Sequence, residues 1–167
     1  EMAAAYRVMR LATAHGVSLD VAVYNILIKG YANSRPPQPE AAQAVLDDIR
    51  IAGLRPSVAS VCCVMDAWCE TNREEEALQL MERCVGDGLV RHTAPLYNTL
   101  IKASSRCRCK RTRGTCSCDP CGCCSPERGM ELVEEMCTHG LVPDSVTLGT
   151  LVDAFCSAGK LMQAWTL

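Results

Sequence analysis

The chain has 167 residues, of which 49% are hydrophobic and 22% charged, and its formal net charge is −2 at pH 7. This balance excludes an intrinsically disordered chain, and the near-neutral charge gives no overall bias toward nucleic acid. No run of about 18 apolar residues occurs, so we expect no membrane span. The pattern starts at Glu1 and stops inside an amphipathic stretch at Leu167, so we expect a fragment of a longer chain.

Two sequence motifs alternate along the chain and predict a series of helix pairs. The first is an apolar run at helical spacing, seen as VYNILIKGYAN at 23–33 and again as LYNTLIKASS at 96–105. The second is an amphipathic stretch that ends in a glycine, at positions 16, 53, 88 and 140. Glycine at such an end caps a helix, because it takes positive φ at little cost. Each unit is therefore predicted to be a helix, a short turn, a second helix and a glycine exit.

The first motif occurs four times, and its copies align on Tyr24, Val61, Tyr97 and Leu148. Their spacings are 37, 36 and 51 residues, so the third unit carries about fifteen extra residues. One helix pair cannot bury its own apolar face, and the repetition therefore predicts stacked pairs in an all-α solenoid. The predicted pairs are 21–33 with 38–51, 58–70 with 73–86, and 94–105 with 126–138.

The segments VAVYNILIKGYA, APLYNTLIKA and GLVPD closely resemble the pentatricopeptide repeat family. The resemblance covers nearly the whole chain. The tetratricopeptide pattern, with Trp and Gly-x-x-Tyr in its first helix, is not met. The resemblance implies an α-solenoid of helix-turn-helix repeats with a Cys-rich loop insertion. Its expected parts are the second helix of a partial repeat (1–20), repeats at 21–57, 58–93 and 94–144, and the first helix and start of the second helix of a further repeat (145–167).

The resemblance also implies a function, because this family is mostly organellar and binds single-stranded RNA with one base per repeat. We therefore expect sequence-selective RNA binding in a mitochondrion or plastid, in support of RNA processing, stability or translation. An alternative is a structural scaffold subunit of an organellar ribosome or RNA polymerase assembly, which binds protein or RNA by shape. A third is a metal-dependent interaction module centred on the cysteine-rich insertion.

The family recognises each base mainly with the residue after the tyrosine position and with the last residue of the repeat. By register, these recognition pairs are Asn25 with Ser57, Cys62 with His92 or Thr93, and Asn98 with Asp144, while Asp20 closes the partial repeat and Gly149 opens the last pair. The resemblance implies cytosine for Asn with Ser and uracil for Asn with Asp, since an Asn amide can donate to and accept from a base. Cys62 with His92 matches no family pairing. Alternatively, Asn25 and Asn98 only brace helix contacts.

Members of the family also sandwich each base with a residue near the start of the first helix, a face expected to be concave. That position holds Ala22, Ala59, Pro95 and Val146. Three of these four side chains are small or rigid, so we expect weaker stacking on each base. Lys29 and Lys102 share one register and could meet phosphates, although the sequence favours a solvated helix face as the explanation.

A cysteine-rich, basic insertion at 106–125 interrupts the repeat 94–144 between its two helices. Seven thiols could supply a tetrahedral zinc site, and the neighbouring arginines and lysine would favour thiolates. These candidate ligands are Cys107, Cys109, Cys116, Cys118, Cys121, Cys123 and Cys124. Only Cys118 and Cys121 have C-x2-C spacing, so the ligand set stays open. The alternatives are an iron–sulfur cluster or a low-complexity loop without metal, either lacking fixed structure or linked by disulfides.

The other six cysteines fall in apolar patterns and are predicted to be small buried hydrophobes in a reducing compartment. They are Cys62, Cys63, Cys69, Cys84, Cys137 and Cys156. We find no catalytic constellation, because His15, His92 and His139 lie near repeat ends rather than around a common nucleophile. The chain is therefore not expected to be an enzyme.

Overall fold

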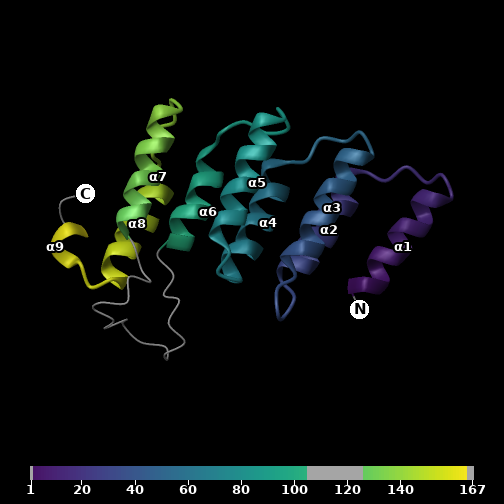
Figure 1. Cartoon of the computed structure of the whole chain (residues 1–167), viewed down its shortest axis with the longest axis horizontal. Helices are drawn as coiled ribbons and strands as arrows, with labels where there is room; N and C mark the ends of the chain where they lie inside the picture. The colour runs from purple at the N-terminus through teal and green to yellow at the C-terminus, as the bar shows by residue number, and fades with distance from the viewer. Residues whose placement is uncertain (1, 105–125, 165–167) are drawn as a thin grey trace. The chain divides into compact units, whose positions relative to one another are not determined.

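The computed structural model describes residues 2–104 and 126–164, and these residues form helices joined by short turns (Figure 1). The chain divides into two compact units, residues 1–91 and residues 92–167, which are considered separately below. Within the described residues, no helix is long and apolar enough to cross a membrane.

The first unit contains a single N-terminal helix followed by two helix pairs. Its helices are α1 (Met2–Ala14), α2 (Val21–Ala32), α3 (Pro39–Ile51), α4 (Val58–Glu70) and α5 (Glu74–Gly86). Helix α2 pairs with α3 and α4 pairs with α5, as Figure 1 shows, and α4 also packs against both α2 and α3. The first helices of the two pairs, α2 and α4, are therefore direct neighbours.

The second unit repeats this arrangement. Its helices are α6 (Ala94–Ser104), α7 (Pro126–Thr138), α8 (Ser145–Ser157) and α9 (Leu161–Ala164). Helix α6 packs against α7 and α8, and α8 also contacts α7 and α9. The three predicted helix pairs are confirmed to within one or two residues at each described end. As in the first unit, the two first helices, α6 and α8, are neighbours.

The glycine exits and the polar helix starts explain why the helices end and begin where they do. The predicted glycines at 16, 53, 88 and 140 all have positive φ, between 67° and 78°. At the other end, Asp20, Ser57 and Asp144 are the N-caps of α2, α4 and α8. The residue that closes one repeat therefore caps the first helix of the next repeat.

Each unit buries its own apolar core between its helices. In the first unit Ile28, Leu46 and Met65 are at most 1% exposed, and in the second Ile101 and Leu151 are equally buried. Each such side chain contributes about 1.5–3 kcal/mol by leaving water.

The prediction that all six scattered cysteines are buried is wrong for two of them. Cys69 and Cys84 are buried and Cys62 and Cys63 are half-buried, but Cys137 and Cys156 are exposed. The helical period explains the error at Cys137: its neighbour Met136 lies on the buried face of α7, and the next residue is turned about 100° away from it.

Candidate nucleic-acid interface

In the first unit, the predicted recognition pair Asn25 and Ser57 is joined through a third residue, Ser60. The Ser60 hydroxyl donates a hydrogen bond to Asn25 Oδ1. Its oxygen also lies 2.7 Å from Ser57 Oγ. Asn25 is on α2 and the two serines stand at the start of α4, so the contact between first helices brings the pair together.

The second unit builds an equivalent cluster from Asn98, Asp144 and Thr147. Thr147 Oγ1 lies 2.7 Å from Asn98 Oδ1 and 2.9 Å from Asp144 Oδ1. Hydrogen bonds from the Thr147 backbone N–H and hydroxyl, and a smaller one from the Asn98 side chain, lower the pKa of Asp144 below its usual range. This carboxylate is therefore ionised at neutral pH and can only accept hydrogen bonds.

Both clusters combine a buried hydroxyl with a half-buried amide. Ser60 is 2% exposed and Thr147 is fully buried, whereas Asn25 and Asn98 remain partly accessible. A buried hydroxyl without a partner would be costly, so the bond to the asparagine also stabilises the helix contact. The bracing role that the sequence left as an alternative is thus present, and it leaves part of each amide open to solvent.

The remaining residues predicted to face RNA occupy exposed positions. Asp20 is exposed and accepts a hydrogen bond from the backbone N–H of Val23 at 3.1 Å. At the sandwich positions, Ala22, Ala59 and Pro95 are exposed and Val146 is 60% exposed. Lys29 is exposed on α2, one helical turn after Asn25.

His92, predicted to recognise a base together with Cys62, makes its own contacts inside the second unit. Its ring stacks on His139 with centroids 3.7 Å apart and planes 12° apart. Its Nδ1 lies 3.0 Å from the hydroxyl of Tyr97, which also donates to Glu135 at 3.3 Å. Burial, and then the nearby His139, lower the pKa of His92, while Glu135 raises it to a smaller extent. Cys62 is half-buried on α4, in the first unit.

The alternative residue for this position, Thr93, has a buried hydroxyl for which the described residues supply no hydrogen-bond partner. The third recognition pair, Cys62 with His92 or Thr93, therefore does not repeat the hydrogen-bonded cluster of the two pairs that contain asparagine.

Sequence reasoning missed two features of these sites. The hydroxyls of Ser60 and Thr147 were not singled out, although both stand one residue before the tyrosine register and three residues after a capping Ser or Asp. That spacing is the capping-box signature, and the structure confirms both boxes. The stack of His92 on His139 joins residues 47 positions apart, which no local pattern reveals.

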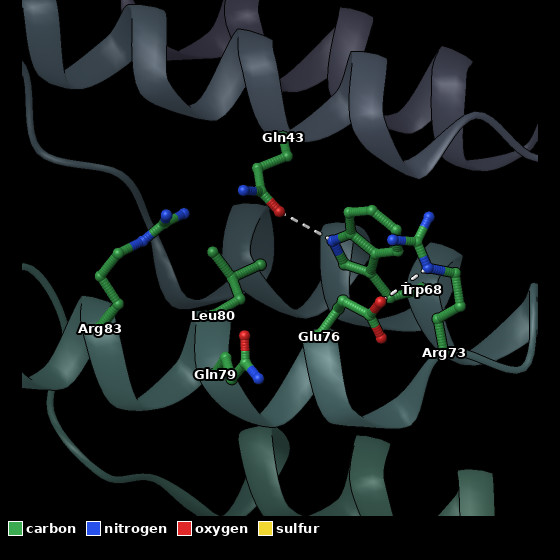
Figure 2. Close-up of a pocket in the computed structure, with 7 residues that line it drawn as sticks. All are labelled: Gln43, Trp68, Arg73, Glu76, Gln79, Leu80 and Arg83. Atoms are coloured by element: carbon green, nitrogen blue, oxygen red, sulfur yellow. Dashed lines mark hydrogen bonds and ion pairs between the residues drawn. The ribbon is translucent and has the colours of Figure 1, made fainter.

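A cavity of about 350 Å³ lies in the first unit, beside the second helices α3 and α5 (Figure 2). Figure 2 shows Gln43 reaching from α3 toward Trp68, and Arg73 lying against the Trp68 ring. The Trp68 indole N–H donates to Gln43 Oε1 at 2.9 Å. The Arg73 guanidinium is 4.3 Å from the centre of the Trp68 ring and bonds Glu76 at 2.8 Å. These bonds tie α3, α4 and α5 together.

The seven candidate zinc ligands between Cys107 and Cys124 lie outside the described residues. Within residues 2–104 and 126–164, no group of three or more His, Cys, Asp or Glu side chains is arranged to hold a metal ion. Zinc binding by the insertion therefore stays a prediction.

Comparison with known proteins connects this helical architecture to a family. The model described as "Pentatricopeptide repeat domain" matches residues 7–70, and models described as "PPR repeat" match residues 59–89 and 139–167. Similar curated proteins include a mitochondrial pentatricopeptide repeat-containing protein of Arabidopsis thaliana, 27% identical over 150 residues. Another is the small ribosomal subunit protein mL103 of the same organism, 28% identical over 141 residues.

The alignments cover 90% and 84% of this chain, but only 31% and 29% of those two proteins. The chain thus spans about a third of their length. Among solved structures, two of the pentatricopeptide repeat protein PPR10 in complex with an 18-nucleotide psaJ RNA element match with a TM-score of 0.67 and 20% identity. Each match covers 95% of this chain and 21% of that protein, and it establishes the α-solenoid fold.

Proposed function

The chain belongs to the pentatricopeptide repeat family, and on this premise we propose that it binds single-stranded RNA selectively in a mitochondrion. The observation that carries the proposal is the joining of Asn25 with Ser57 and of Asn98 with Asp144 through hydrogen bonds. The mitochondrial name of one relative favours this organelle over a plastid. RNA processing, stability or translation is the role that such binding would support.

The two pairs offer complementary groups to the edge of a base. Each asparagine amide supplies a donor and an acceptor, Ser57 adds a hydroxyl, and Asp144 adds a carboxylate that only accepts. An accepting carboxylate suits the N–H of uracil, whereas a hydroxyl can also accept from the amino group of cytosine. We therefore propose cytosine at the Asn25 repeat and uracil at the Asn98 repeat, with one base between them. The mechanism is binding rather than catalysis.

The experiment is selection of RNA from a random single-stranded pool by the full-length protein and by its Asn25→Ala and Asn98→Ala variants. We expect an enriched motif with two pyrimidines separated by one base, and each variant should lose the preference at one of them. A lost pair of base contacts is worth about 1–3 kcal/mol, or roughly 5- to 150-fold in discrimination. Thr71→Val, which removes a C-cap hydroxyl that donates to backbone carbonyls of α4, is the matched control. Unchanged preferences in both alanine variants would refute base recognition.

A second candidate function is that of a scaffold in a mitochondrial ribosome, because mL103 is a ribosomal protein of similar sequence. Sedimentation of mitochondrial extracts separates the two candidates. A scaffold would travel with a ribosomal subunit after mild ribonuclease treatment of exposed RNA, whereas a protein bound to single-stranded RNA would be released.

Zinc binding by the seven cysteines of the insertion stays a separate proposal that rests on sequence alone. Metal analysis of the purified full-length protein tests it. A variant with all seven cysteines changed to serine should lose the metal and keep the base preferences set by Asn25 and Asn98.

A further inference from the structure

We propose that Ser60 and Thr147 are positioning residues for base selection, each fixing the orientation of the recognition asparagine in the preceding repeat. The inference rests on the proposed function and deepens it. In this arrangement a base is selected by three side chains from two neighbouring repeats. The third is a buried hydroxyl that does not itself contact RNA.

In the first cluster, the number of hydroxyl protons determines which group is the donor in each hydrogen bond. Ser60 has one hydroxyl proton, and it is donated to Asn25 Oδ1. The short Ser57–Ser60 contact of 2.7 Å must then use the proton of Ser57. Ser57 Oγ in turn accepts from the Ser60 backbone N–H at 3.1 Å. The carbonyl end of the Asn25 amide is therefore held toward α4, and its amino end is the donor left for a base.

The second cluster places a hydroxyl beside the oxygen of its asparagine in the same way. Thr147 Oγ1 approaches Asn98 Oδ1 at 2.7 Å, while Asp144 already accepts from the Thr147 backbone N–H at 2.7 Å. The Thr147 hydroxyl has a single proton, and since Asp144 accepts from the backbone N–H, that proton can be donated to Asn98 Oδ1. The carbonyl end of the Asn98 amide is then held toward α8, as that of Asn25 is held toward α4.

The distribution of hydroxyls along the chain agrees with this role. The register before the tyrosine position holds Ser60 and Thr147 where the preceding recognition residue is asparagine. In the repeat that follows Cys62, the same register holds Leu96, which is fully buried. This buried position therefore holds a hydroxyl when the recognition residue of the preceding repeat is an asparagine, and a leucine when it is a cysteine.

Without the hydroxyl, no hydrogen bond from the following repeat holds the oxygen end of the amide in place. The side chain can then turn by 180° and present either its donor or its acceptor to the base. Affinity for the correct base should fall modestly, while affinity for the other bases should rise. Loss of discrimination, rather than loss of binding, is therefore the expected signature.

The test uses the full-length protein and four RNAs that differ only at the base whose preference Asn25→Ala abolishes. In Ser60→Ala we expect discrimination at that base to fall at least about fivefold, a change within the range of one base-contact pair. Discrimination at the Asn98 base should stay unchanged. Thr147→Val should give the reciprocal result, and Ser60→Thr, which keeps the hydroxyl, should restore selectivity.

Controls separate positioning from stability. Thr71→Val removes a hydroxyl at the C-cap of α4, where it donates to backbone carbonyls of α4 and not to Asn25, and should leave discrimination intact. Should Ser60→Ala unfold, Ser60→Cys keeps the volume with a much weaker donor and is expected to lose discrimination in the same way. Folding of every variant is checked by its thermal transition.

Two results overturn the inference and point to different causes. If the wild-type protein shows no preference at the Asn25 base, the proposed function fails and the positioning role falls with it. If Asn25→Ala loses the preference but Ser60→Ala and Ser60→Cys keep it, base recognition stands and only the positioning role is wrong.

Discussion

At the scale of single residues, the ends of the repeats have two tasks at once. Ser57 and Asp144 cap α4 and α8, and each is also joined to a recognition asparagine through the hydroxyl of Ser60 or Thr147. Removing an N-cap costs about 0.5–2 kcal/mol of stability, so changing either residue would disturb folding together with any effect on RNA. The asparagines are not N-caps, but their variants also remove the acceptors of the buried Ser60 and Thr147 hydroxyls, so the folding of each variant has to be measured beside its base preference.

The stacked pair of His92 and His139 is a second residue-scale feature. The groups that face His92 are His139, which directly follows α7, Tyr97 on α6 and Glu135 on α7. Burial and the neighbouring imidazole lower the pKa of His92 below its ordinary value of 6.5, so the neutral ring is favoured in the folded chain. The two rings can stack closely because they need not both carry a charge.

This pair predicts a loss of stability in mild acid. The pKa of His92 is lower in the folded than in the unfolded chain, so the unfolded chain binds more protons as the pH falls. The stabilisation is complete above pH 6.5 and is lost as the pH falls through the folded-state value. We expect the unfolding midpoint to drop between pH 7.5 and 5.5, and less steeply in His92→Phe, which keeps an aromatic ring. Equal pH dependence in both proteins would contradict this assignment.

At the scale of elements, one glycine sets how closely α7 approaches its neighbours. A Cβ at Gly129 would lie 2.9 Å from a methyl carbon of Leu151 and 3.3 Å from the hydroxyl of Ser104. Leu151 is 1% exposed and has little room to move. Glycine inside a helix costs about 1 kcal/mol relative to alanine. The close packing of α7 on α6 and α8 offsets that cost.

A pair of glycine substitutions tests this packing. Gly129→Val should lower the free energy of unfolding by about 1–3 kcal/mol, because a branched side chain overfills the contact. Gly149 is the matched control: it lies inside α8, and a Cβ there would meet nothing within 4 Å. Gly149→Ala should raise stability by about 0.5–1 kcal/mol. Urea titration of both variants measures the difference, and a tolerated valine at 129 would disprove the close contact.

At the scale of the whole molecule, charge limits how the chain can attract RNA. The formal net charge is −2, so unselective attraction to phosphate should be weak and selectivity has to come from contacts to bases. Lys29 is exposed one turn along α2 from Asn25, and we propose that it meets a phosphate of the bound RNA. For single strands, each phosphate neutralised contributes a slope of about −0.7 to the logarithmic dependence of affinity on salt.

Salt titration of RNA binding tests this placement. Lys29→Gln should make the slope less steep by about 0.7 and leave the base preferences unchanged. Arg128→Gln serves as the control, because Arg128 lies on a second helix and pairs with Glu131 at 2.7 Å. If Arg128→Gln changed the salt slope more than Lys29→Gln, the RNA would lie on the second helices of the pairs rather than on the first.

The sequence by itself determined the helix pairs, their registers and the family. These follow from local signals, namely the helical period of apolar residues, the glycines that end helices and the Ser or Asp residues that start them. The pairing of Asn25 with Ser57 and of Asn98 with Asp144 was also expected from the repeat register. Local patterns failed at Cys137 and Cys156, because small differences in helical phase decide whether a cysteine faces the core.

Only the tertiary structure decided how the recognition side chains are held. The bond from Ser60 to Asn25 spans 35 positions, and that from Thr147 to Asn98 spans 49. Both depend on how one first helix packs against the next, and the bonds fix which end of each amide is occupied. The stack of His92 on His139 arises in the same way, from the return of α7 along α6. Hydrogen-bond direction is a property of three-dimensional contacts, so the repeat pattern could name the asparagines but not show which of their atoms are left to meet a base.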